Sequence, residues 1–330
     1  MSARLKPRIG VAGAGAWGRN IVRNCAEAGV LAAICDQSAA TLEALALEYR
    51  GVRTEVDYAQ FLDLPLDAVV VAAPARRHAG MALAAIERGK HVFVEKPFAL
   101  DVEDAVTTVA RAQERGVRSF AGHLLLYHPA IEELCRQVAA GAIGELHHIR
   151  SRRLGFGRLR SFENVWWSFA PHDVAVMLAL GEGIPAQCNS QAVDVTGSGI
   201  ADFCYADYTF TGGLTAHVEV GWLDPVRSHR LDAVGSEGVL TFTDSREGPR
   251  LTLNSREIVS GEDGERTLRA AGAEQIPFGQ AEPLRAEIDA FVRSIETGLP
   301  ARTDGQSAIG VTMALAMAEA CSLGASAVAV

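Results

Sequence analysis

The chain has few cysteines, and their spacing forms no motif. The six thiols are scattered along the whole length, at Cys25, Cys35, Cys135, Cys188, Cys204 and Cys321. No C-x-x-C pair is present, although such pairs are typical of zinc sites and of redox-active dithiols. We therefore expect structural thiols in a reducing compartment and no metal site.

Long apolar runs and blocks of like charge are also missing. No run approaches the roughly 20 apolar residues that a membrane span requires, and residues 1–13 lack the apolar core of a signal peptide. The net charge of −9, with no extended charge block, argues against binding to nucleic acid or to an anionic membrane. These absences predict a cytoplasmic protein with no nucleic-acid or membrane partner.

What is present is the composition of an ordinary globular protein in a rather long chain. Hydrophobic residues make up 48% of the 330 residues and charged residues 22%. This length exceeds that of a typical single domain, so we expect two domains, each with its own core.

The first part of the chain alternates between short apolar segments and segments with helical spacing. Strands are predicted at 8–13, 30–36, 67–74, 91–95 and 117–123, and each of the first four is followed by a helical pattern. Because these strands are apolar on both faces, the alternation predicts a parallel sheet that helices cover on both sides.

A glycine motif joins the first strand to the first helix. The letters GAGAWG supply Gly13, Gly15 and Gly18, with Ala16 and Trp17 inside the same loop. In a dinucleotide-binding loop the first glycine allows a tight turn, the second lets a pyrophosphate approach and the third lets the helix pack closely.

An acidic residue follows the second strand, at the place where such a fold binds the adenine ribose. Asp36 can accept hydrogen bonds from the ribose hydroxyls and would repel a 2′-phosphate. We therefore expect NAD as the cofactor, in preference to NADP. The alternative is that Asp36 is only a turn residue at the end of a strand.

The letters EKP follow the strand at 91–95 without a break. Ligands of open parallel sheets bind at the carboxyl ends of the strands, where Pro74 and Glu95-Lys96-Pro97 are expected to lie. A lysine there can donate to a substrate oxygen, and partial burial would lower its pKa. The alternative is an exposed lysine beside a solvated glutamate.

These motifs together resemble the glucose-fructose oxidoreductase, inositol dehydrogenase and MocA family. The resemblance covers essentially the whole chain, and its most specific mark is Glu95-Lys96-Pro97. The family's proline and histidine after the fourth strand appear as Pro74 and His78. The resemblance implies that these residues and Glu95 line the cofactor, and that Lys96 binds the substrate near the nicotinamide and exchanges a proton with it.

The resemblance also predicts the fold class and the domains. We expect an α/β protein whose residues 1–123 form a Rossmann domain with a doubly wound parallel sheet. Residues 124–330 are then an α+β domain with an open, mostly antiparallel sheet that binds substrate and forms the contact of a homodimer or homotetramer. The C-terminal helices, about 280–297 and 305–323, can pack back against the first domain or against the sheet.

The second half has its own strand pattern. The stretches 145–156, 201–213, 214–223 and 230–244 read as strands joined by glycine-rich turns. This pattern agrees with the expected antiparallel sheet.

Between the first two of these strands lies an apolar helical segment, 163–181. Pro171 suits the first turn of a helix, which would place His172 in that turn. A histidine there can accept a hydroxyl proton as a hydride leaves, so we assign His172 as a catalytic base, with a structural histidine as the alternative.

The resemblance implies an aspartate or asparagine four positions before this histidine, but this chain has Ser168. We count Ser168 and Asp173 as substrate-binding candidates. Asp173 can orient His172, or it can be an ordinary acid at the start of a helix.

Arginines cluster in the first strand of the second half and just after it, at Arg150, Arg152, Arg153, Arg158 and Arg160. Along a strand the first two share one face and the third lies on the other. Guanidinium groups bind phosphate or carboxylate, so the cluster suggests an anionic substrate, for which we select Arg158 and Arg160. The alternative is that these arginines solvate an exposed strand or an oligomer rim. His123 and Tyr127, which follow the last strand of the first domain, are further substrate candidates or simply packing residues.

Within the family the chain resembles one branch more than the inositol or glucose enzymes. The segments GHLLLYHPA, FAPHDV and GWLDP resemble the bacterial nucleotide-sugar 3-dehydrogenases. This implies NAD-dependent oxidation of the 3-hydroxyl of UDP-N-acetylglucosamine or its uronate. The alternatives are a dehydrogenase of a free sugar or polyol, a non-catalytic dinucleotide sensor, and a glycosidase that uses NAD for transient oxidation.

Overall fold

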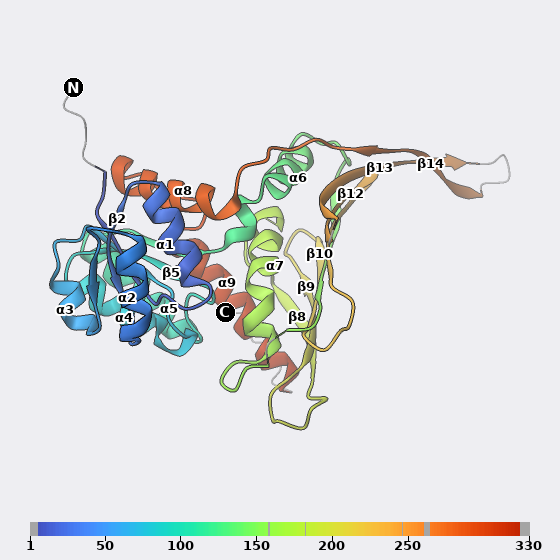
Figure 1. The fold of residues 1–330 in the computed structure, drawn as a ribbon. Coiled ribbons are helices and arrows are strands. Elements are labelled where there is room, and N and C mark those ends of the chain that lie inside the picture. The colour runs from blue at the N-terminus through green and yellow to red at the C-terminus, as the bar shows by residue number, and fades with distance from the viewer. Residues whose placement is uncertain (1–5, 158, 182, 246, 261–264, 324–330) are drawn as a thin grey trace. The chain divides into compact units, whose positions relative to one another are not determined.

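The computed structural model of the chain describes residues 6–157, 159–181, 183–245, 247–260 and 265–323. Its internal contacts divide the chain into two units (Figure 1). The first unit is Met1–Tyr127 with Glu282–Thr312, and the second is His128–Ala281 with Met313–Val330. The position of the domain boundary along the chain stays a prediction.

The first unit alternates strands with helices. In chain order its elements are β1 (Ile9–Ala12), α1 (Gly18–Glu27), β2 (Leu31–Cys35), α2 (Ala39–Glu48), β3 (Arg53–Glu55), α3 (Tyr58–Asp63), β4 (Ala68–Val71), η1 (Ala75–Arg77), α4 (His78–Glu87), β5 (His91–Glu95), α5 (Val102–Glu114), β6 (Ser119–Gly122), η2 (Leu124–Tyr127) and α8 (Pro283–Thr297). Helix α9 (Gly305–Ser322) contributes its first part to this unit and its last part to the second.

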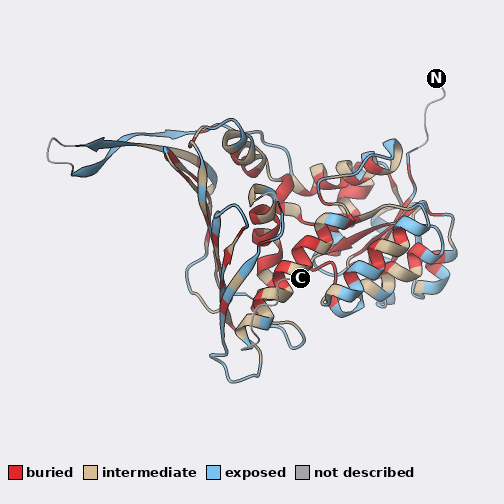
Figure 2. Cartoon of the chain, turned by 180° about the vertical axis from the view of Figure 1, so that it is seen from behind, coloured by how far each residue is buried: buried red, intermediate tan, exposed pale blue. Residues whose placement is uncertain are grey.

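The strands of this unit form one parallel sheet in the order β3-β2-β1-β4-β5-β6. This order is that of a doubly wound dinucleotide-binding fold, in which the strand order reverses between the parallel neighbours β1 and β4. Figure 2 shows the strands buried and the outer faces of the covering helices exposed. The predicted Rossmann fold is therefore confirmed.

The core of the first unit draws on both ends of the chain. The rings of Phe93 and Phe120, on neighbouring strands, stack with their centroids 4.9 Å apart, and Phe291 of α8 meets Phe93 edge-on at 5.7 Å. All three side chains are fully buried. Burying such a ring contributes about 1.5–3 kcal/mol, so α8 is fixed on the sheet by the hydrophobic effect.

The second unit is built around a larger sheet. Its elements are α6 (Pro129–Ala139), β7 (Leu146–Leu154), α7 (Val165–Gly181), β8 (Gln187–Val193), β9 (Phe203–Thr209), β10 (Thr215–Gly221), β11 (Ser228–Gly235), β12 (Gly238–Ser245), β13 (Gly248–Ser260) and β14 (Arg266–Gln275). The eight strands follow the order β14-β13-β12-β11-β7-β10-β9-β8. Only β7 and β10 pair in parallel, so the predicted mostly antiparallel sheet is confirmed.

The two faces of this sheet differ in character. Helix α7 packs on β10, β7 and β9, and the residues of β7 alternate accordingly. Ile149 and Ser151 are buried on the face toward the helix, whereas Arg150 and Arg152 are exposed on the opposite face. No described helix of this unit covers that opposite face, which we call the open face (Figure 1).

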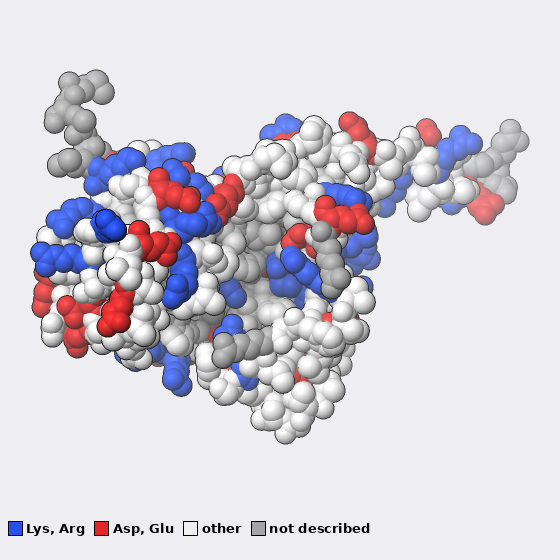
Figure 3. Space-filling view, viewed as in Figure 1, with Lys and Arg blue, Asp and Glu red and all other residues white. Residues whose placement is uncertain are grey.

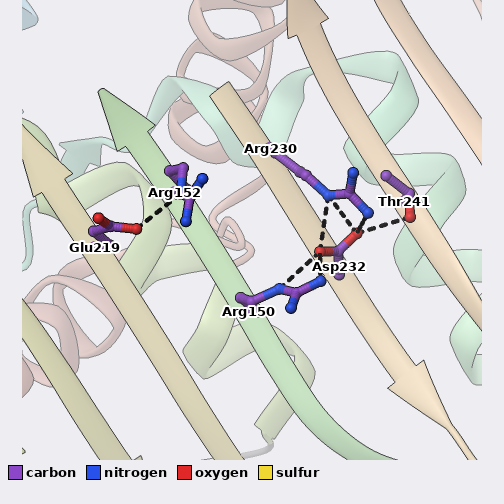
Figure 4. A network of polar contacts seen from close by, with 6 residues as sticks. All are labelled: Arg150, Arg152, Glu219, Arg230, Asp232 and Thr241. Atoms are coloured by element: carbon purple, nitrogen blue, oxygen red, sulfur yellow. Dashed lines mark hydrogen bonds and ion pairs between the residues drawn. The ribbon is translucent and has the colours of Figure 1, made fainter. Parts of the chain in front are cut away.

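Arginines and carboxylates neutralise one another on the open face (Figure 4). Asp232 of β11 is fully buried between Arg150 and Arg230, with nitrogen–oxygen distances of 2.7 and 2.8 Å, and it also accepts a hydrogen bond from the hydroxyl of Thr241. Arg152 pairs separately with Glu219 at 2.8 Å. The parity predicted for Arg150 and Arg152 is therefore confirmed.

Candidate functional site

The glycine-rich loop occupies the turn between β1 and α1. Gly13 has φ +101°, a conformation that only glycine adopts without strain, and a Cβ there would collide with the carbonyl of Ala72. A Cβ at Gly18 would collide with the carbonyl of Gly13. These two glycines are thus required by the turn and by the close packing of the helix.

Gly15 has a different environment. A Cβ added at this position would meet no atom within 4 Å, so the backbone there faces open space. Trp17 precedes α1 without capping its N-terminus through the side chain, and no acidic residue lies in the first turn. An exposed loop backbone beside a helix N-terminus that is free of acidic side chains fits a bound pyrophosphate.

The carboxylate of Asp36 is tied to this loop. Its Oδ2 accepts a hydrogen bond of 2.7 Å from the N–H of Ala14, and its Oδ1 accepts one of 2.9 Å from the N–H of Ser38. Asp36 therefore sits directly after β2 and next to the glycine-rich loop, as the sequence predicts. Its contact with an adenine ribose stays a prediction.

The Glu95-Lys96-Pro97 motif lies at the carboxyl end of β5. Glu95 is 7% exposed, and its Oε1 accepts a 2.7 Å hydrogen bond from the indole Nε1 of Trp17. Burial raises the pKa of Glu95, and the Trp17 bond opposes this shift. Lys96 is partly buried and joined to Pro97 by a cis peptide bond. One hydrogen bond thus links the two motifs on which the cofactor prediction rests.

His78 fixes the loops on the same edge of the sheet. It is 2% exposed, and its two ring nitrogens lie 2.7 Å from the carbonyl oxygens of Pro97 and Ala73. Burial lowers the pKa of His78, so the neutral ring donates to one of these carbonyls. Pro74 separates Ala73 from the η1 turn that leads to His78. These contacts tie the loop after β4 to the loop after β5.

His123 and Tyr127 are both buried in the first unit. Burial lowers the pKa of His123 to about 4, and its ring nitrogens have no hydrogen-bond partner among the described residues. The hydroxyl of Tyr127 lies 2.9 Å from Oγ1 of Thr303, and the guanidinium of Arg302 lies 5.0 Å from its ring centroid. Their predicted contact with substrate is not tested by these features.

Helix α7 of the second unit begins earlier than the sequence predicts. The expectation that Pro171 and His172 lie in its first turn is wrong, because the helix starts at Val165 and contains Pro171 in its interior. Oδ1 of Asn164 accepts a 3.1 Å hydrogen bond from the N–H of Trp167, which caps the helix seven residues before the proline. Burial on most sides of α7 outweighs the cost of an interior proline.

His172 and Ser168 therefore lie one helical turn apart in the body of α7. Ser168 is 3% exposed, and its N–H donates to the carbonyl of Asn164. His172 is partly buried. The roles predicted for these two residues stay predictions.

Asp173 is a fully buried carboxylate on the side of α7 that faces the sheet. Its Oδ2 lies 2.5 Å from Nε of Arg153, its Oδ1 lies 3.2 Å from Nη2 of the same arginine, and Oγ of Ser151 donates to Oδ1 at 2.6 Å. Burial alone would raise the pKa of Asp173, but Arg153 and His229 hold it below the usual value. The interpretation as an acid at a helix start is therefore wrong, because Asp173 lies mid-helix and pairs with β7.

The structure gives little information on the two arginines that we selected from the sequence as substrate-binding candidates. Arg158 lies outside the described residues. Nε of Arg160 lies 3.5 Å from Oε1 of Glu163 in a partly exposed ion pair. Substrate binding by either arginine stays a prediction.

The sequence placed Arg153 in the arginine cluster, but we did not select it as a substrate-binding candidate, and nothing pointed to His229. The alternation of side chains along a strand places Arg153 on the face opposite Arg152. This alternation is the one sequence signal that separates Arg153 from its neighbours. His229 is brought to this place by the pairing of β11 with β7, where it lies opposite Arg153. No sequence motif marks that neighbourhood.

The surface of the first unit carries charges of both signs, and the described residues contain no cluster that could bind a metal ion. On the face of the first unit drawn in Figure 3, basic and acidic residues are interspersed. Among the described residues no group of three or more histidine, cysteine, aspartate or glutamate side chains could hold a metal ion. Within the same residues, no helix combines the length and apolarity needed to cross a membrane.

Two family models match the chain in succession. Residues 7–123 match the model described as the oxidoreductase family with an NAD-binding Rossmann fold, and residues 131–241 match the GFO/IDH/MocA C-terminal domain. The fold and these matches define an NAD-dependent oxidoreductase of the dehydrogenase class. The chain belongs to the Gfo/Idh/MocA family, and the predictions of NAD, of the dehydrogenase class and of this family are confirmed.

Individual relatives match nearly the whole chain. UDP-N-acetylglucosamine 3-dehydrogenase of Acidithiobacillus ferrooxidans is 29% identical over 311 residues, which cover 90% of this chain and 91% of that protein. A solved structure of that enzyme superposes with a TM-score of 0.84 at 25% identity and covers 96% of this chain and 98% of its own. Inositol 2-dehydrogenase 1 of Saccharopolyspora erythraea is 28% identical over 342 residues, 95% of this chain and 92% of that protein.

Proposed function

We propose that this dehydrogenase oxidises the 3-hydroxyl of a UDP-sugar, UDP-N-acetylglucosamine or its uronate, to the 3-keto sugar. The observation that carries the proposal is the similarity to UDP-N-acetylglucosamine 3-dehydrogenase along almost the full length of both chains. The FAPHDV segment, which suggested this branch of the family, lies in α7 and contains His172.

The cofactor site in this proposal is the carboxyl edge of the parallel sheet. Gly13, Gly15, Ala16, Trp17 and Gly18 would hold the pyrophosphate of the cofactor. The remaining cofactor contacts are Asp36, Pro74, His78, Glu95 and Lys96. Support comes from the open space at Gly15 and from the Trp17–Glu95 hydrogen bond, which holds this loop against the lysine motif.

Two side chains carry the proton chemistry in this proposal. NAD, when bound, supplies the acceptor for the hydride that leaves C3 of the sugar. Lys96 binds the hydroxyl oxygen and stabilises the charge that develops on it, and His172 accepts the hydroxyl proton. The substrate contacts of His123, Tyr127, Arg158, Arg160, Ser168 and Asp173 belong to the proposal in the same way.

The proposal is tested by following nicotinamide absorbance with purified protein, NAD and four separate substrates. These are UDP-N-acetylglucosamine, its uronate, glucose and myo-inositol, with 2-oxoglutarate added in parallel wells to reoxidise any reduced cofactor that stays bound. We expect reduction with a UDP-sugar only, loss of rate in Lys96→Met and in His172→Asn, and no change in His147→Asn, which alters an exposed histidine of β7. Reduction with the free sugars alone would contradict the UDP-sugar assignment.

The second candidate is a dehydrogenase of a free polyol or sugar. It is favoured by the similarity to inositol 2-dehydrogenase 1, which also spans nearly both chains. In that case myo-inositol or glucose supports reduction and the uridine diphosphate brings no benefit. NAD binding without reduction by any of the four would favour a sensor or a glycosidase instead.

Assembly and location complete the proposal. We expect a homodimer or homotetramer, because the open face of the second sheet is covered by no described helix of its own unit. A cytoplasmic location is part of the same proposal and agrees with the scattered, unpaired cysteines. Light scattering on the purified chain tests the assembly, and a monomeric mass at micromolar concentration would contradict it.

A further inference from the structure

Arg153 has an environment unlike that of its neighbours on β7. Arg150 and Arg152 lie on the open face and pair with Asp232 and Glu219 (Figure 4). Arg153 points the other way, toward α7, and its side chain is 20% exposed. One strand thus carries two arginines whose charge is neutralised at the open face and one arginine beneath the helix that also holds His172.

The carboxylate of Asp173 binds one edge of the Arg153 guanidinium, the edge formed by Nε and Nη2. Nε and Nη2 of the guanidinium contact the two carboxylate oxygens, whereas none of the contacts of Arg153 with the described residues uses Nη1. Ser151 donates to Asp173 as well, which fixes the carboxylate in place. A guanidinium held in this way is pre-oriented and retains donors for a second acceptor.

His229 adds a second buried donor beside the same pair. It is 7% exposed, and its Nε2 lies 3.7 Å from Oδ1 of Asp173 and has no hydrogen-bond partner among the described residues. Its Nδ1 lies 3.6 Å from Oδ2 of Asp244. Both separations exceed a hydrogen bond, so the ring is held near two carboxylates without being bonded to either.

The charges around this group nearly cancel. Arg153 offsets Asp173, and Arg227 offsets Asp244 at 2.5 Å. The ring of Phe242 meets that of His229 edge-on at 5.6 Å, and His128 meets the same phenylalanine at 5.2 Å. An added anion would therefore meet the donors of Arg153 and His229 without an excess negative charge to repel it.

We infer that Arg153, held by Asp173 and flanked by His229, binds an anionic oxygen of the substrate. This inference rests on the proposed function and names the residues that recognise the negatively charged group of the substrate. The oxygen belongs to the diphosphate of the sugar nucleotide or to the carboxylate of a uronate, since guanidinium binds both in the same way.

The test compares Arg153→Lys with the matched variant Arg152→Lys, one residue away on the open face. Lysine keeps the positive charge beside buried Asp173 but loses the fixed fork of donors, and His229→Leu removes the second donor. For each variant KM is measured with UDP-N-acetylglucosamine and with its uronate, and Kd is measured by titration with UDP and with glucuronate. Thermal unfolding confirms that the variants are folded.

If the diphosphate is bound, Arg153→Lys raises KM for both sugar nucleotides and Kd for UDP by about 10-fold or more. If the uronate carboxylate is bound, only the constants for the uronate and for glucuronate rise. Arg152→Lys leaves every constant unchanged in both cases. His229→Leu shifts the same constants as Arg153→Lys, because the two side chains share one ligand.

Constants for Arg153→Lys within twofold of the wild type in all four measurements would overturn the inference. The titrations need no turnover, so they decide it even if the wild-type chain oxidises neither sugar nucleotide. In that event the proposed function fails on its own, and weakened UDP or glucuronate binding in Arg153→Lys still supports the anion site. Absence of measurable binding of either ligand to the wild type would also overturn the inference.

Discussion

The indole of Trp17 donates a 2.7 Å hydrogen bond to the carboxylate of Glu95. Trp17 belongs to the glycine-rich loop after β1, and Glu95 ends β5, so the bond joins two motifs that are far apart in the sequence. Glu95 is nearly buried, and an isolated carboxylate there would be costly. The loop and the lysine motif are therefore held as one unit at the carboxyl edge of the sheet.

Replacing Trp17 by phenylalanine tests this connection. Trp17 is 42% exposed, so the loss of the indole removes little buried area and mainly leaves Glu95 without its side-chain donor. We expect the free energy of unfolding, measured by urea denaturation, to fall by about 1–3 kcal/mol. In a Glu95→Ala background the same substitution should have almost no further effect, and equal losses in both backgrounds would contradict the connection.

The two glycines of the loop should respond to alanine in opposite ways. Gly15→Ala places a methyl group in open space, so stability should be unchanged while Kd for NAD rises, because the methyl group occupies the path of the pyrophosphate. Gly13→Ala should unfold more easily by about 2 kcal/mol or more, since φ +101° and the Ala72 carbonyl both oppose a side chain. Titration with NAD and urea denaturation check the pair, and unchanged NAD binding in Gly15→Ala would contradict the assigned site.

Glu287 of α8 predicts a pH dependence of stability. It is fully buried, its carboxyl oxygens have no hydrogen-bond partner among the described residues, and burial, followed by the charge of Glu95, raises its pKa well above 4.5. A carboxyl group whose pKa is raised by folding contributes stability that is complete below the unfolded-state pKa and is lost as pH rises through the folded-state pKa. The wild-type chain should therefore lose stability relative to Glu287→Gln as the pH increases.

The measurement is urea denaturation of wild type and Glu287→Gln across the pH range from about 5 to about 8. We expect the difference to grow by up to about 1.4 kcal/mol per pH unit until the folded-state pKa is passed. Glu43→Gln, which changes an exposed residue of α2, serves as the control with no such trend. A constant difference between wild type and Glu287→Gln would show that Glu287 does not titrate in this way.

The contribution of the N-terminal cap of α7 to stability can also be measured. Asn164 accepts from the N–H of Trp167, and its amide donates to Oε1 of Glu319 at 3.1 Å. Asn164→Ala should reduce the free energy of unfolding by about 1–2 kcal/mol, because both bonds are lost. Asn164→Ser keeps a capping oxygen and should recover about half of that loss. If both variants were as stable as the wild type, the cap would lie elsewhere.

Much of the first unit could be predicted from local patterns. Apolar strands with helices between them identify a parallel sheet, and the glycine motif marks the start of the first helix. A serine before a helical segment is a common N-cap, and Ser38 caps α2 by accepting from the N–H of Thr41. The short strand β3, Arg53–Glu55, was missed because three mostly exposed residues carry no periodic apolar signal.

Several elements of the second unit could not be predicted from the sequence. Strands β8, β13 and β14 were not predicted, since their residues are largely exposed and lack alternation between apolar and polar positions. Pro171 misled the assignment of the helix start, because the energetic preference of one residue was outweighed by the burial of the whole helix. The pairing of Arg153 with Asp173 depends on the packing of α7 against β7, and only tertiary structure reveals it.

Oxidation at the 3-hydroxyl is tested most directly by tracing the hydride that leaves C3 of the sugar. UDP-N-acetylglucosamine and its uronate are prepared with deuterium at C3, each is incubated with the enzyme and NAD, and the reduced cofactor is analysed by mass spectrometry. We expect the nicotinamide to gain the deuterium from C3, and substrate deuterated at C4 to yield unlabelled reduced cofactor. Reduced cofactor without deuterium from the C3-labelled substrates, or no reduced cofactor at all, would contradict oxidation at the 3-hydroxyl of a UDP-sugar.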